Sequence, residues 1–405
     1  MFIISSLSMW NHQRLYELMA CDLRFKTTII FVPFCVYSKE DNQKTLMQVK
    51  AYFQRHKTPF LIYDELDFSQ KSFEEQFSPD VLFYPQWYEG LYPTPIDLKT
   101  QSEKLICFIP YGIGILPMGI GTHAEAANFA WKIYQMCDTH LQVAKTLMRC
   151  QGDNVVVVGH PRAEEYALTP TLDPWKPQEK KKKRIIWAPH FTITEGLSPL
   201  HRSNFLQLAD KIWSITQTYK DRVQFAFKPH PRLITELYNN PDWGEEKTDA
   251  YYQQWADGTN TQLETGEYVE LFKTSDAMIH DSGSFTVEYL FTHNPVMFIT
   301  SDAENLKQTE EMLDIGCEAM DASYIGYTES EIISFVDEVV LKGNDSKKEE
   351  RERFFQKYLS STSGKTASEL IYKDICKELF TTNRVIVSII LLVLLCSLLL
   401  CLFKG

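Results

Sequence analysis

The sequence has 405 residues, of which 44% are hydrophobic and 23% charged, so it carries enough apolar surface for two folded domains. Its net charge of −12 argues against a nucleic-acid partner, because contacts with phosphates need a basic face. The nine cysteines stand singly, a pattern typical of reduced thiols in the cytoplasm rather than of a secreted disulfide scaffold.

The first half of the chain alternates short β-branched or aromatic runs with longer helical patterns, which is typical of βαβ units on a parallel sheet. Strands are predicted at 27–33, 80–84, 105–110 and 155–159, and helices at 42–55 and 122–136. These elements make up a first Rossmann-like domain, on the acceptor side, over residues 1–167. The stretch 168–183, with three prolines and a basic cluster, is predicted to be a linker, or alternatively a phosphate-binding patch.

The same alternation restarts after the linker and predicts a second Rossmann-like domain, the nucleotide-donor domain, over residues 184–345. Its strands are predicted at 184–188, 223–228, 277–280 and 296–300, and its helices at 203–219, 285–292 and 327–342. Further helices follow in the segment 346–383. Together these patterns predict an α/β fold with two facing Rossmann-like domains and a site in the cleft between them.

The end of the chain has a different composition. Residues 385–403 read VIVSIILLVLLCSLLLCLF, without a charge, with Arg384 before them and Lys404 after them. At 1.5 Å per residue this run would span about 28 Å, close to the thickness of a bilayer's hydrocarbon core. It predicts a C-terminal transmembrane helix, a membrane anchor at 384–404, with a buried core helix as the alternative. No signal peptide is recognised at the start, so the folded domains are expected at the inner or cytoplasmic membrane, facing the cytoplasm.

Ionisable side chains follow two predicted strands of the second half. Ligands of open parallel sheets bind outside the carboxyl ends of the strands. Lys228, His230 and Arg232 share one short prolyl turn after the strand at 223–228, and all three can donate to phosphate. His190 follows the strand at 184–188 and is expected to bind donor or acceptor, or else to shape its loop.

A third loop follows the strand at 277–280 and leads into the predicted helix at 285–292. Ser282, Gly283 and Ser284 stand where the helix begins, so free N–H groups and hydroxyls would meet there and could bind a pyrophosphate. A plain helix cap is the alternative. Glu288 lies one turn further on and could accept from ribose or polyol hydroxyls, or could simply be an exposed helix residue.

The first half offers fewer candidates for chemistry. Tyr111 follows the strand at 105–110, and His123 opens the next predicted helix; either could act as base or line the acceptor side, and His123 could also be only a cap. Gly112 and Gly114 do not complete a dinucleotide-binding fingerprint, and no metal-binding spacing is present. Neither a cofactor nor a metal is therefore expected.

Several of these segments resemble the CDP-glycerol glycerophosphotransferase family, which are teichoic-acid-polymerase-like enzymes of GT-B architecture. The similar segments are KPHP at 228–231, DAMIHDSGSFTVEYLFTHNPVMFIT at 276–300, WNHQRLYELMACDLRFKTTIIFVP at 10–33 and DVLFYPQWY at 80–88. The resemblance implies that His230 contacts the donor pyrophosphate. His230 and His190 are the predicted catalytic residues. It also implies that residues 282–284 hold the phosphates. One departure is clear: the family's His-Gly-Thr-like motif is absent, and Tyr111-Gly112-Ile113 stands in its place.

The expected function is transfer of glycerol phosphate, or a related polyol phosphate, from a CDP-activated donor to a hydroxyl of a lipid-linked or surface glycan at the membrane. A GT-B sugar transferase using a UDP- or GDP-sugar is one alternative. A catalytically inactive, membrane-tethered scaffold is the other; the missing first-domain histidine favours it. The ionisable residues retained in three strand-end loops argue against it.

Overall fold

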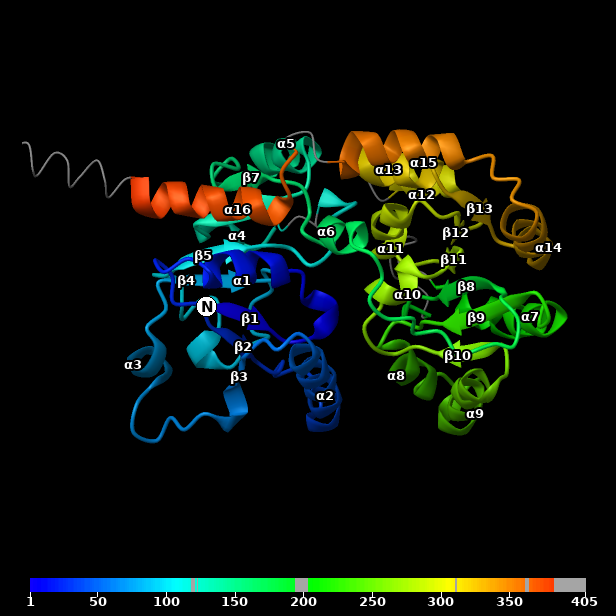
Figure 1. The fold of residues 1–405 in the computed structure, drawn as a ribbon, viewed down its shortest axis with the longest axis horizontal. Coiled ribbons are helices and arrows are strands. Elements are labelled where there is room, and N and C mark those ends of the chain that lie inside the picture. Colours follow the sequence, from blue (N-terminus) through cyan, green and yellow to red (C-terminus); the bar gives the residue numbers. More distant parts are fainter. Residues whose placement is uncertain (118–120, 122, 194–202, 310–311, 361–363, 382–405) are drawn as a thin grey trace, which may run out of the picture.

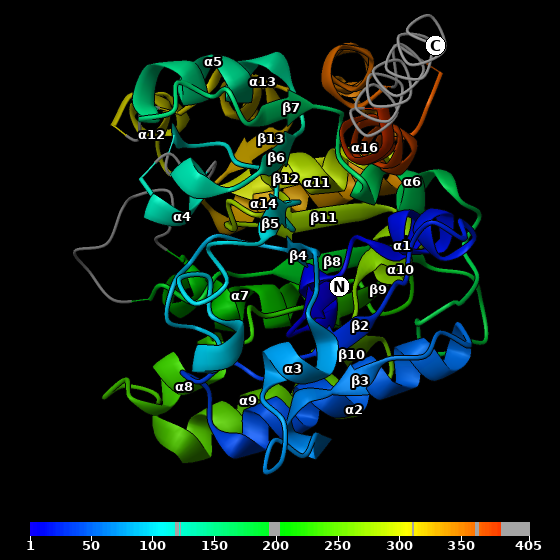
Figure 2. The same cartoon turned by 90° about the vertical axis from the view of Figure 1, so that its left-hand side faces the viewer.

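The structure, a computed structural model, describes residues 1–117, 121, 123–193, 203–309, 312–360 and 364–381. Its two domains each consist of a parallel sheet with helices on both faces, and they lie next to each other in Figure 1. Figure 2, viewed from the side of the first domain, shows the two sheets one behind the other. The chain is therefore an α/β protein with two Rossmann-like halves.

The first sheet has seven parallel strands in the order β3-β2-β1-β4-β5-β6-β7. This is a doubly wound order, in which the chain reverses direction between β1 and β4. The strands are β1 (Phe2–Ile4), β2 (Ile29–Phe31), β3 (Leu61–Ile62), β4 (Val81–Tyr84), β5 (Leu105–Phe108), β6 (Lys132–Gln135) and β7 (Val155–Val157). The helices are α1 (Gln13–Ala20), α2 (Lys39–Arg55), α3 (Phe73–Phe77), α4 (Glu125–Phe129), α5 (Asp138–Leu147) and α6 (Arg162–Ala167).

The second sheet has six parallel strands in the order β10-β9-β8-β11-β12-β13, with its reversal between β8 and β11. The strands are β8 (Lys183–Ala188), β9 (Val223–Phe227), β10 (Thr261–Leu263), β11 (Ala277–His280), β12 (Val296–Ile299) and β13 (Tyr324–Gly326). The helices are α7 (Phe205–Thr218), α8 (Leu233–Tyr238), α9 (Gly244–Asp257), α10 (Val269–Lys273), α11 (Phe285–Glu288), α12 (Ala303–Thr309), α13 (Asp314–Asp321), α14 (Glu329–Ser334) and α15 (Lys348–Phe354). A 3₁₀ turn η6 (Tyr289–Thr292) continues α11, and π-helical turns η7 (Phe335–Leu341) and η8 (Phe355–Leu359) continue α14 and α15.

Burial on both faces explains why the central strands are apolar runs rather than alternating ones. All five residues of β9 are buried, and so are all four of β11, because helices cover each side of the sheet. On one face Trp187 stacks on Phe227 with ring centroids 5.0 Å apart, and Trp255 lies 5.2 Å from the same phenyl ring. This packing makes the sheet a rigid base for the loops at its carboxyl edge.

The last described helix returns the chain to the first domain. α16 (Ala367–Cys376), with a π-helical turn η9 (Lys377–Thr381), lies against the first domain in Figure 1. Ile371 and Ile375 are fully buried there, and the Tyr372 hydroxyl donates to Asp22 at 2.7 Å. The C-terminal segment therefore ties the two domains together.

Two predictions need correction. The helix expected at 122–136 is confirmed only over α4, which ends at Phe129; Lys132–Gln135 instead form strand β6, which pairs with β5 and β7. The C-terminal transmembrane helix in the predicted fold class is also corrected. Among residues up to 381 that the structure describes, no helix is long and apolar enough to cross a bilayer; α16 buries its apolar residues in the first domain instead. The predicted anchor at 384–404 lies outside the described residues.

Candidate active site

Three loops lie next to one another at the carboxyl edge of the second sheet, because they follow the neighbouring strands β9, β8 and β11. Backbone N–H groups bind the loops together: Lys228 donates to Trp187 at 2.8 Å and His230 donates to Pro189 at 3.0 Å. The chain reverses direction between β8 and β11, which is where open α/β sheets bind their ligands. The structure thus brings the predicted residues of the second domain to one edge.

Lys228 is a buried lysine at this edge of the sheet. Its side chain comes directly after β9, and the residue is 5% exposed. The ammonium lies 5.8 Å from the ring centroid of Tyr268 and makes no hydrogen bond or ion pair with a described residue. Burial lowers the pKa of Lys228 from 10.5 to about 8, while the nearby carboxylates of Glu264 and Glu267 oppose this decrease. Since an unpaired buried charge costs several kcal/mol, roughly, this position suits an anionic ligand.

His230 is held in one tautomer by the backbone. Its Nδ1 accepts from the Arg232 N–H at 3.2 Å, so the neutral ring carries its proton on Nε2. Burial, followed by the nearby His190, Lys228 and Arg232, lowers the pKa of His230 to about 3. A neutral imidazole of this kind donates a hydrogen bond near pH 7 but rarely takes up a proton. His230 is therefore better suited to contact phosphate than to act as a base.

His190 and Arg232 surround this histidine. The His190 ring lies 5.1 Å from that of His230, and its Nδ1 is 2.9 Å from the Thr192 hydroxyl. The Arg232 guanidinium lies 4.2 Å above the Phe191 ring and pairs with Glu236 at 3.0 Å. With 54% of its side chain exposed, Arg232 stands at the rim, whereas Lys228 lies deeper in the site.

The loop at 282–284 opens a shorter helix than predicted. Only Phe285–Glu288 is α-helical, so the helix dipole contributes less than a long helix would. The N–H groups of Phe285 and Thr286 donate to the carbonyls of Ser282 and Gly283, at 3.2 and 3.3 Å. Ser284 is exposed and makes no capping hydrogen bond with its side chain. The Ser282 N–H donates to Nδ1 of His280 at 3.2 Å. Among the described residues, the Ser284 hydroxyl and the N–H groups of Gly283 and Ser284 are therefore the donors open to a ligand.

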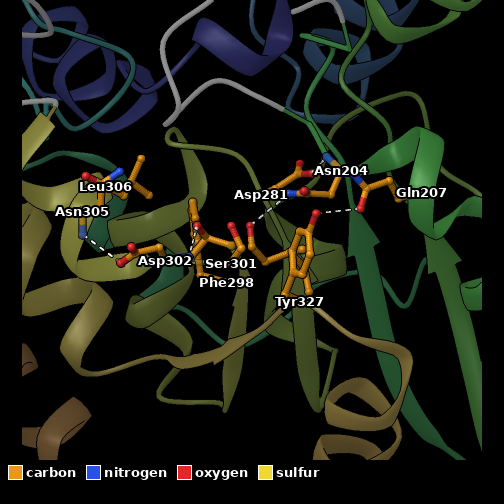
Figure 3. Close-up of a pocket in the computed structure, with 11 residues that line it drawn as sticks. Asn204, Gln207, Asp281, Phe298, Ser301, Asp302, Asn305, Leu306 and Tyr327 are labelled. Atoms are coloured by element: carbon orange, nitrogen blue, oxygen red, sulfur yellow. Dashed lines mark hydrogen bonds between the residues drawn. The ribbon is translucent and has the colours of Figure 1, made fainter.

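Asp281 holds these loops in place, a role that the sequence did not reveal. Its buried carboxylate accepts from the His190 N–H at 2.7 Å and the Ser203 hydroxyl at 3.1 Å. It also accepts from the Asn204 N–H at 2.7 Å (Figure 3). Burial raises the pKa of Asp281 to about 6, and these donors oppose the rise. The sequence shows only an acidic residue before Ser282, and nothing in its spacing points to donors from another loop.

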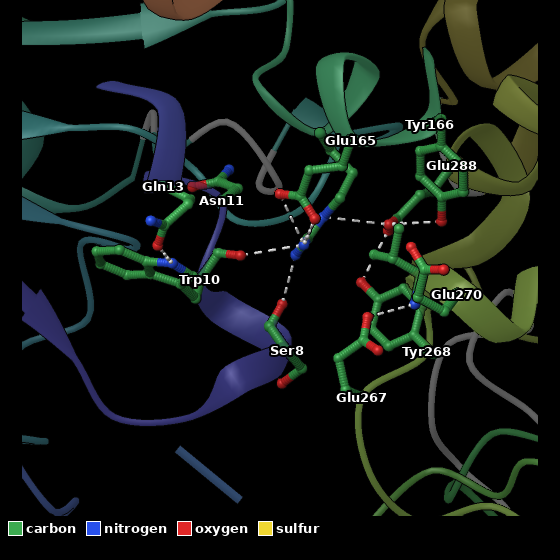
Figure 4. A network of polar contacts seen from close by, with 12 residues as sticks. Ser8, Trp10, Asn11, Gln13, Glu165, Tyr166, Glu267, Tyr268, Glu270 and Glu288 are labelled. Carbon is green, nitrogen blue, oxygen red and sulfur yellow. Dashed lines mark hydrogen bonds and ion pairs between the residues drawn. The ribbon is translucent and has the colours of Figure 1, made fainter. Parts of the chain in front are cut away.

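Glu288 lies in the interface between the domains rather than on an exposed helix face. Its carboxylate accepts from the hydroxyls of Tyr268 at 3.0 Å and Tyr166 at 3.1 Å, and it lies 3.4 Å from Nε of Arg162 (Figure 4). Burial raises the pKa of Glu288, while Arg162 opposes the rise. The predicted contact with ribose or polyol hydroxyls remains a prediction, and it requires the tyrosine hydroxyls to give way.

The first-domain candidates, Tyr111 and His123, have no recorded contact with the loops of the second sheet among the described residues. Burial raises the pKa of Tyr111 to about 12, so its phenol keeps its proton at neutral pH. The side chain of His123 is exposed. The Tyr111 phenol is therefore a poor base, which leaves His123 as the first-domain candidate for that role. His12, after β1, is fully buried, and burial lowers its pKa to about 3.

Residues 136–377 match the family described as CDP-Glycerol:Poly(glycerophosphate) glycerophosphotransferase, over more than half of the chain. The chain belongs to this family. It is thus a glycerophosphotransferase-like enzyme, and the match includes all three loops of the second sheet. No curated protein matches the sequence.

Solved structures with the same fold include two kinds of protein. A wall teichoic acid polymerase, TagF with CDPG, is 13% identical with a TM-score of 0.60, covering 93% of this chain and 90% of its own. S. aureus MnaA with UDP is 13% identical with a TM-score of 0.56, covering 93% and 96%. The Neisseria meningitidis UDP-GlcNAc 2-epimerase is 12% identical with a TM-score of 0.54, covering 93% and 98%. At these identities the likeness concerns the GT-B-like fold alone.

For an enzyme of this family, replacing His230 tests the phosphate contact directly. A hydrogen bond to a charged group contributes about 1.5–3 kcal/mol, so His230→Ala should lower kcat/KM about 10- to 150-fold. Steady-state kinetics would measure this, with His56→Ala at the exposed end of α2 as the control. A His230→Ala enzyme within about twofold of wild type would show that His230 does not contact the reacting phosphate.

Proposed function

We propose that the protein transfers glycerol phosphate, or a related polyol phosphate, from a CDP-activated donor to a hydroxyl of a membrane-linked glycan. The observation that carries the proposal is Lys228, a buried ammonium at the point where the second sheet reverses direction, which makes no hydrogen bond or ion pair with a described residue. Family membership supports a glycerol phosphate group, and the TagF structure of the same fold was obtained with CDPG.

The reaction follows from the groups at the edge of the sheet. The oxygen of an acceptor hydroxyl attacks the β-phosphorus and forms a phosphodiester. The bond from the β-phosphorus to the bridging oxygen breaks, and CMP leaves with the electron pair. Lys228 and the Nε2–H of His230 stabilise the charge that gathers on the pyrophosphate, and the N–H groups near Ser284 hold it in place. The acceptor's proton passes to a base, a role that we assign to His123.

Aromatic residues at the edge of the first sheet support a glycan as the acceptor. Tyr37 and Tyr88 are 46% and 47% exposed, in the loops after β2 and β4. Tyr111 lies in the loop after β5, and its N–H donates to Pro85 at 3.0 Å, which ties it to the loop of Tyr88. Tyrosine rings offer flat apolar faces with a polar tip, which suit the faces and hydroxyls of sugar rings. An acceptor linked to a membrane would place the enzyme at the cytoplasmic face, as predicted.

Sugar transfer is the second candidate, because proteins of this fold include MnaA with UDP and an epimerase bound to UDP-GlcNAc. A UDP- or GDP-sugar would use the same buried ammonium. An inactive scaffold is less consistent with the site, because burying an ammonium that forms no hydrogen bond or ion pair with a described residue costs stability unless an anionic ligand binds it.

Product analysis separates these functions. The purified protein would be incubated with CDP-glycerol, CDP-ribitol, UDP-sugars and GDP-sugars over a lipid and glycan extract. We expect CMP from a CDP-polyol, and none of it in the absence of the extract. Release of a nucleoside diphosphate from a sugar donor would favour the second candidate instead. Absence of product from every donor would contradict both and favour the scaffold.

A further inference from the structure

A polar pocket lies beside the three loops, at the carboxyl ends of β11 and β12. Its volume is about 190 Å³. The residues that line it include Asn204, Gln207, Asp281, Ser301, Asp302 and Tyr327. Figure 3 shows Tyr327 and Gln207 on one side of it and Asp302 and Asn305 on the other.

The lining suits a neutral ligand with many hydroxyl groups. Among the described residues that line it are two carboxylates, Asp281 and Asp302, and no lysine, arginine or histidine, so a phosphate would be repelled there. The other polar side chains of this lining are hydroxyls and amides. The Tyr327 hydroxyl donates to Oε1 of Gln207 at 2.8 Å, and the amide nitrogen of Gln207 then has no acceptor among the described residues. Hydroxyls can donate to the carboxylates and accept from this amide.

The strand order sets the position of the pocket along the site. From β9 to β12 the edge carries Lys228, then His190, then the loop at 282–284, and then the pocket. Neighbouring strands lie about 4.8 Å apart, so the pocket is about 5 Å beyond the phosphate loop and about 14 Å from Lys228. A CDP-polyol has its nucleoside, two phosphates and polyol in one line. With the phosphates between Lys228 and Ser284, one end of the donor reaches the pocket.

We infer that this pocket binds the polyol of the donor, an inference that rests on the proposed function. The volume corresponds to about six water molecules of about 30 Å³ each, which is room for an acyclic polyol of three to five carbons. Ser301, Asp302 and Gln207 receive its hydroxyls. Asp281 links the two parts of the site, because its carboxylate lines the pocket while it holds the loops of His190 and Asn204.

Binding measurements on pocket variants test the inference. Ser301→Leu would fill the pocket from an exposed position, and Asp302→Asn would remove its carboxylate. Glu304→Gln is the matched control, because Glu304 is exposed on α12, pairs with Lys307 and does not line the pocket. Calorimetry would give the Kd of CMP, CDP, CDP-glycerol and CDP-ribitol for the wild type and each variant.

We expect the Kd of CDP to stay within about twofold in every variant, and that of the CDP-polyols to rise about tenfold in Ser301→Leu. Asp302→Asn should raise the Kd of the CDP-polyols about threefold or more, and Glu304→Gln should leave this Kd unchanged. If the variants bound CDP and the CDP-polyols equally more weakly, or bound both as tightly as the wild type does, the inference about the pocket would be overturned. The proposed function would still stand in that case, provided that the wild type turns over a CDP-polyol. A wild type that neither binds nor turns over a CDP-polyol would overturn the proposed function as well.

Discussion

Replacing Lys228 with methionine is expected to lower kcat/KM about 100- to 1,000-fold, because a charge at the reacting phosphate is lost from a buried site. The same change should stabilise the fold by about 1–3 kcal/mol, since the buried ammonium forms no hydrogen bond or ion pair with any residue that the structure describes. Kinetics and urea unfolding would measure the two effects. Few substitutions outside a ligand site both remove activity and raise stability, so the opposite signs identify Lys228 as a binding residue.

The pH dependence gives this prediction a second readout. The folded pKa of Lys228, about 8, lies below its ordinary 10.5, so the folded state loses this proton first. Wild-type kcat/KM should therefore fall above about pH 8. Between about pH 8 and 10.5 the Lys228 side chain is protonated in the unfolded state but largely neutral in the folded state, so the free energy of unfolding rises with pH in this range. Below about pH 8 the side chain is charged in both states, and burying the charge destabilises the fold by its full amount. Lys228→Met should remove both trends, and the exposed Lys211→Met should remove neither. An unchanged kcat/KM in Lys228→Met would contradict the account.

The second large effect is expected at Arg162, which lies in the domain interface and is 2% exposed. Its guanidinium donates to the carbonyls of Ser8 and Trp10, at 2.9 and 3.0 Å, and pairs with Glu165 and Glu288 (Figure 4). Arg162→Leu would leave buried carboxylates uncompensated, at a cost of about 3–5 kcal/mol in the free energy of unfolding. Chemical unfolding would measure this loss.

The control for Arg162 is Arg222→Leu, because the Arg222 side chain is 60% exposed and lies 3.7 Å from Asp337. Arg222→Leu should lower the free energy of unfolding by less than about 1 kcal/mol. A double-mutant cycle with Glu288→Gln would then measure the coupling between the domains. If Arg162→Leu cost less than about 1 kcal/mol, the buried network would not hold the domains together.

The sequence predicted the longer strands well but missed several short ones. The runs that gave β4, β5, β8, β9, β11 and β12 are continuous and apolar, as expected for strands that are buried on both faces. β10 and β13 have three residues each and carry too little pattern to be recognised. β6 was merged into a helix because only its pairing with β5 and β7 defines it. Long-range pairing, rather than local propensity, decides such segments.

The candidate site was predictable only in part, for a similar reason. Loops that follow neighbouring parallel strands lie at the same edge of the sheet, where ligands bind. This rule needs only the strands and their direction, and it was sufficient to place Lys228, His190 and Ser282 at one edge. The burial of Lys228 depends on Tyr268 and the loop after β10, and Glu288 meets Arg162 from the other domain. These contacts join residues far apart in the chain, so no local pattern reveals them.

The most direct test of polyol phosphate transfer follows the β-phosphate itself. Wild type and Lys228→Met would be given CDP-glycerol labelled at the β-phosphorus, and the acceptor and nucleotide fractions would be separated. The account predicts that the label moves with glycerol into the acceptor while unlabelled CMP is released, and that Lys228→Met shows almost none of this transfer. Label that leaves with the nucleotide as CDP, or equal transfer by the variant, would contradict the account.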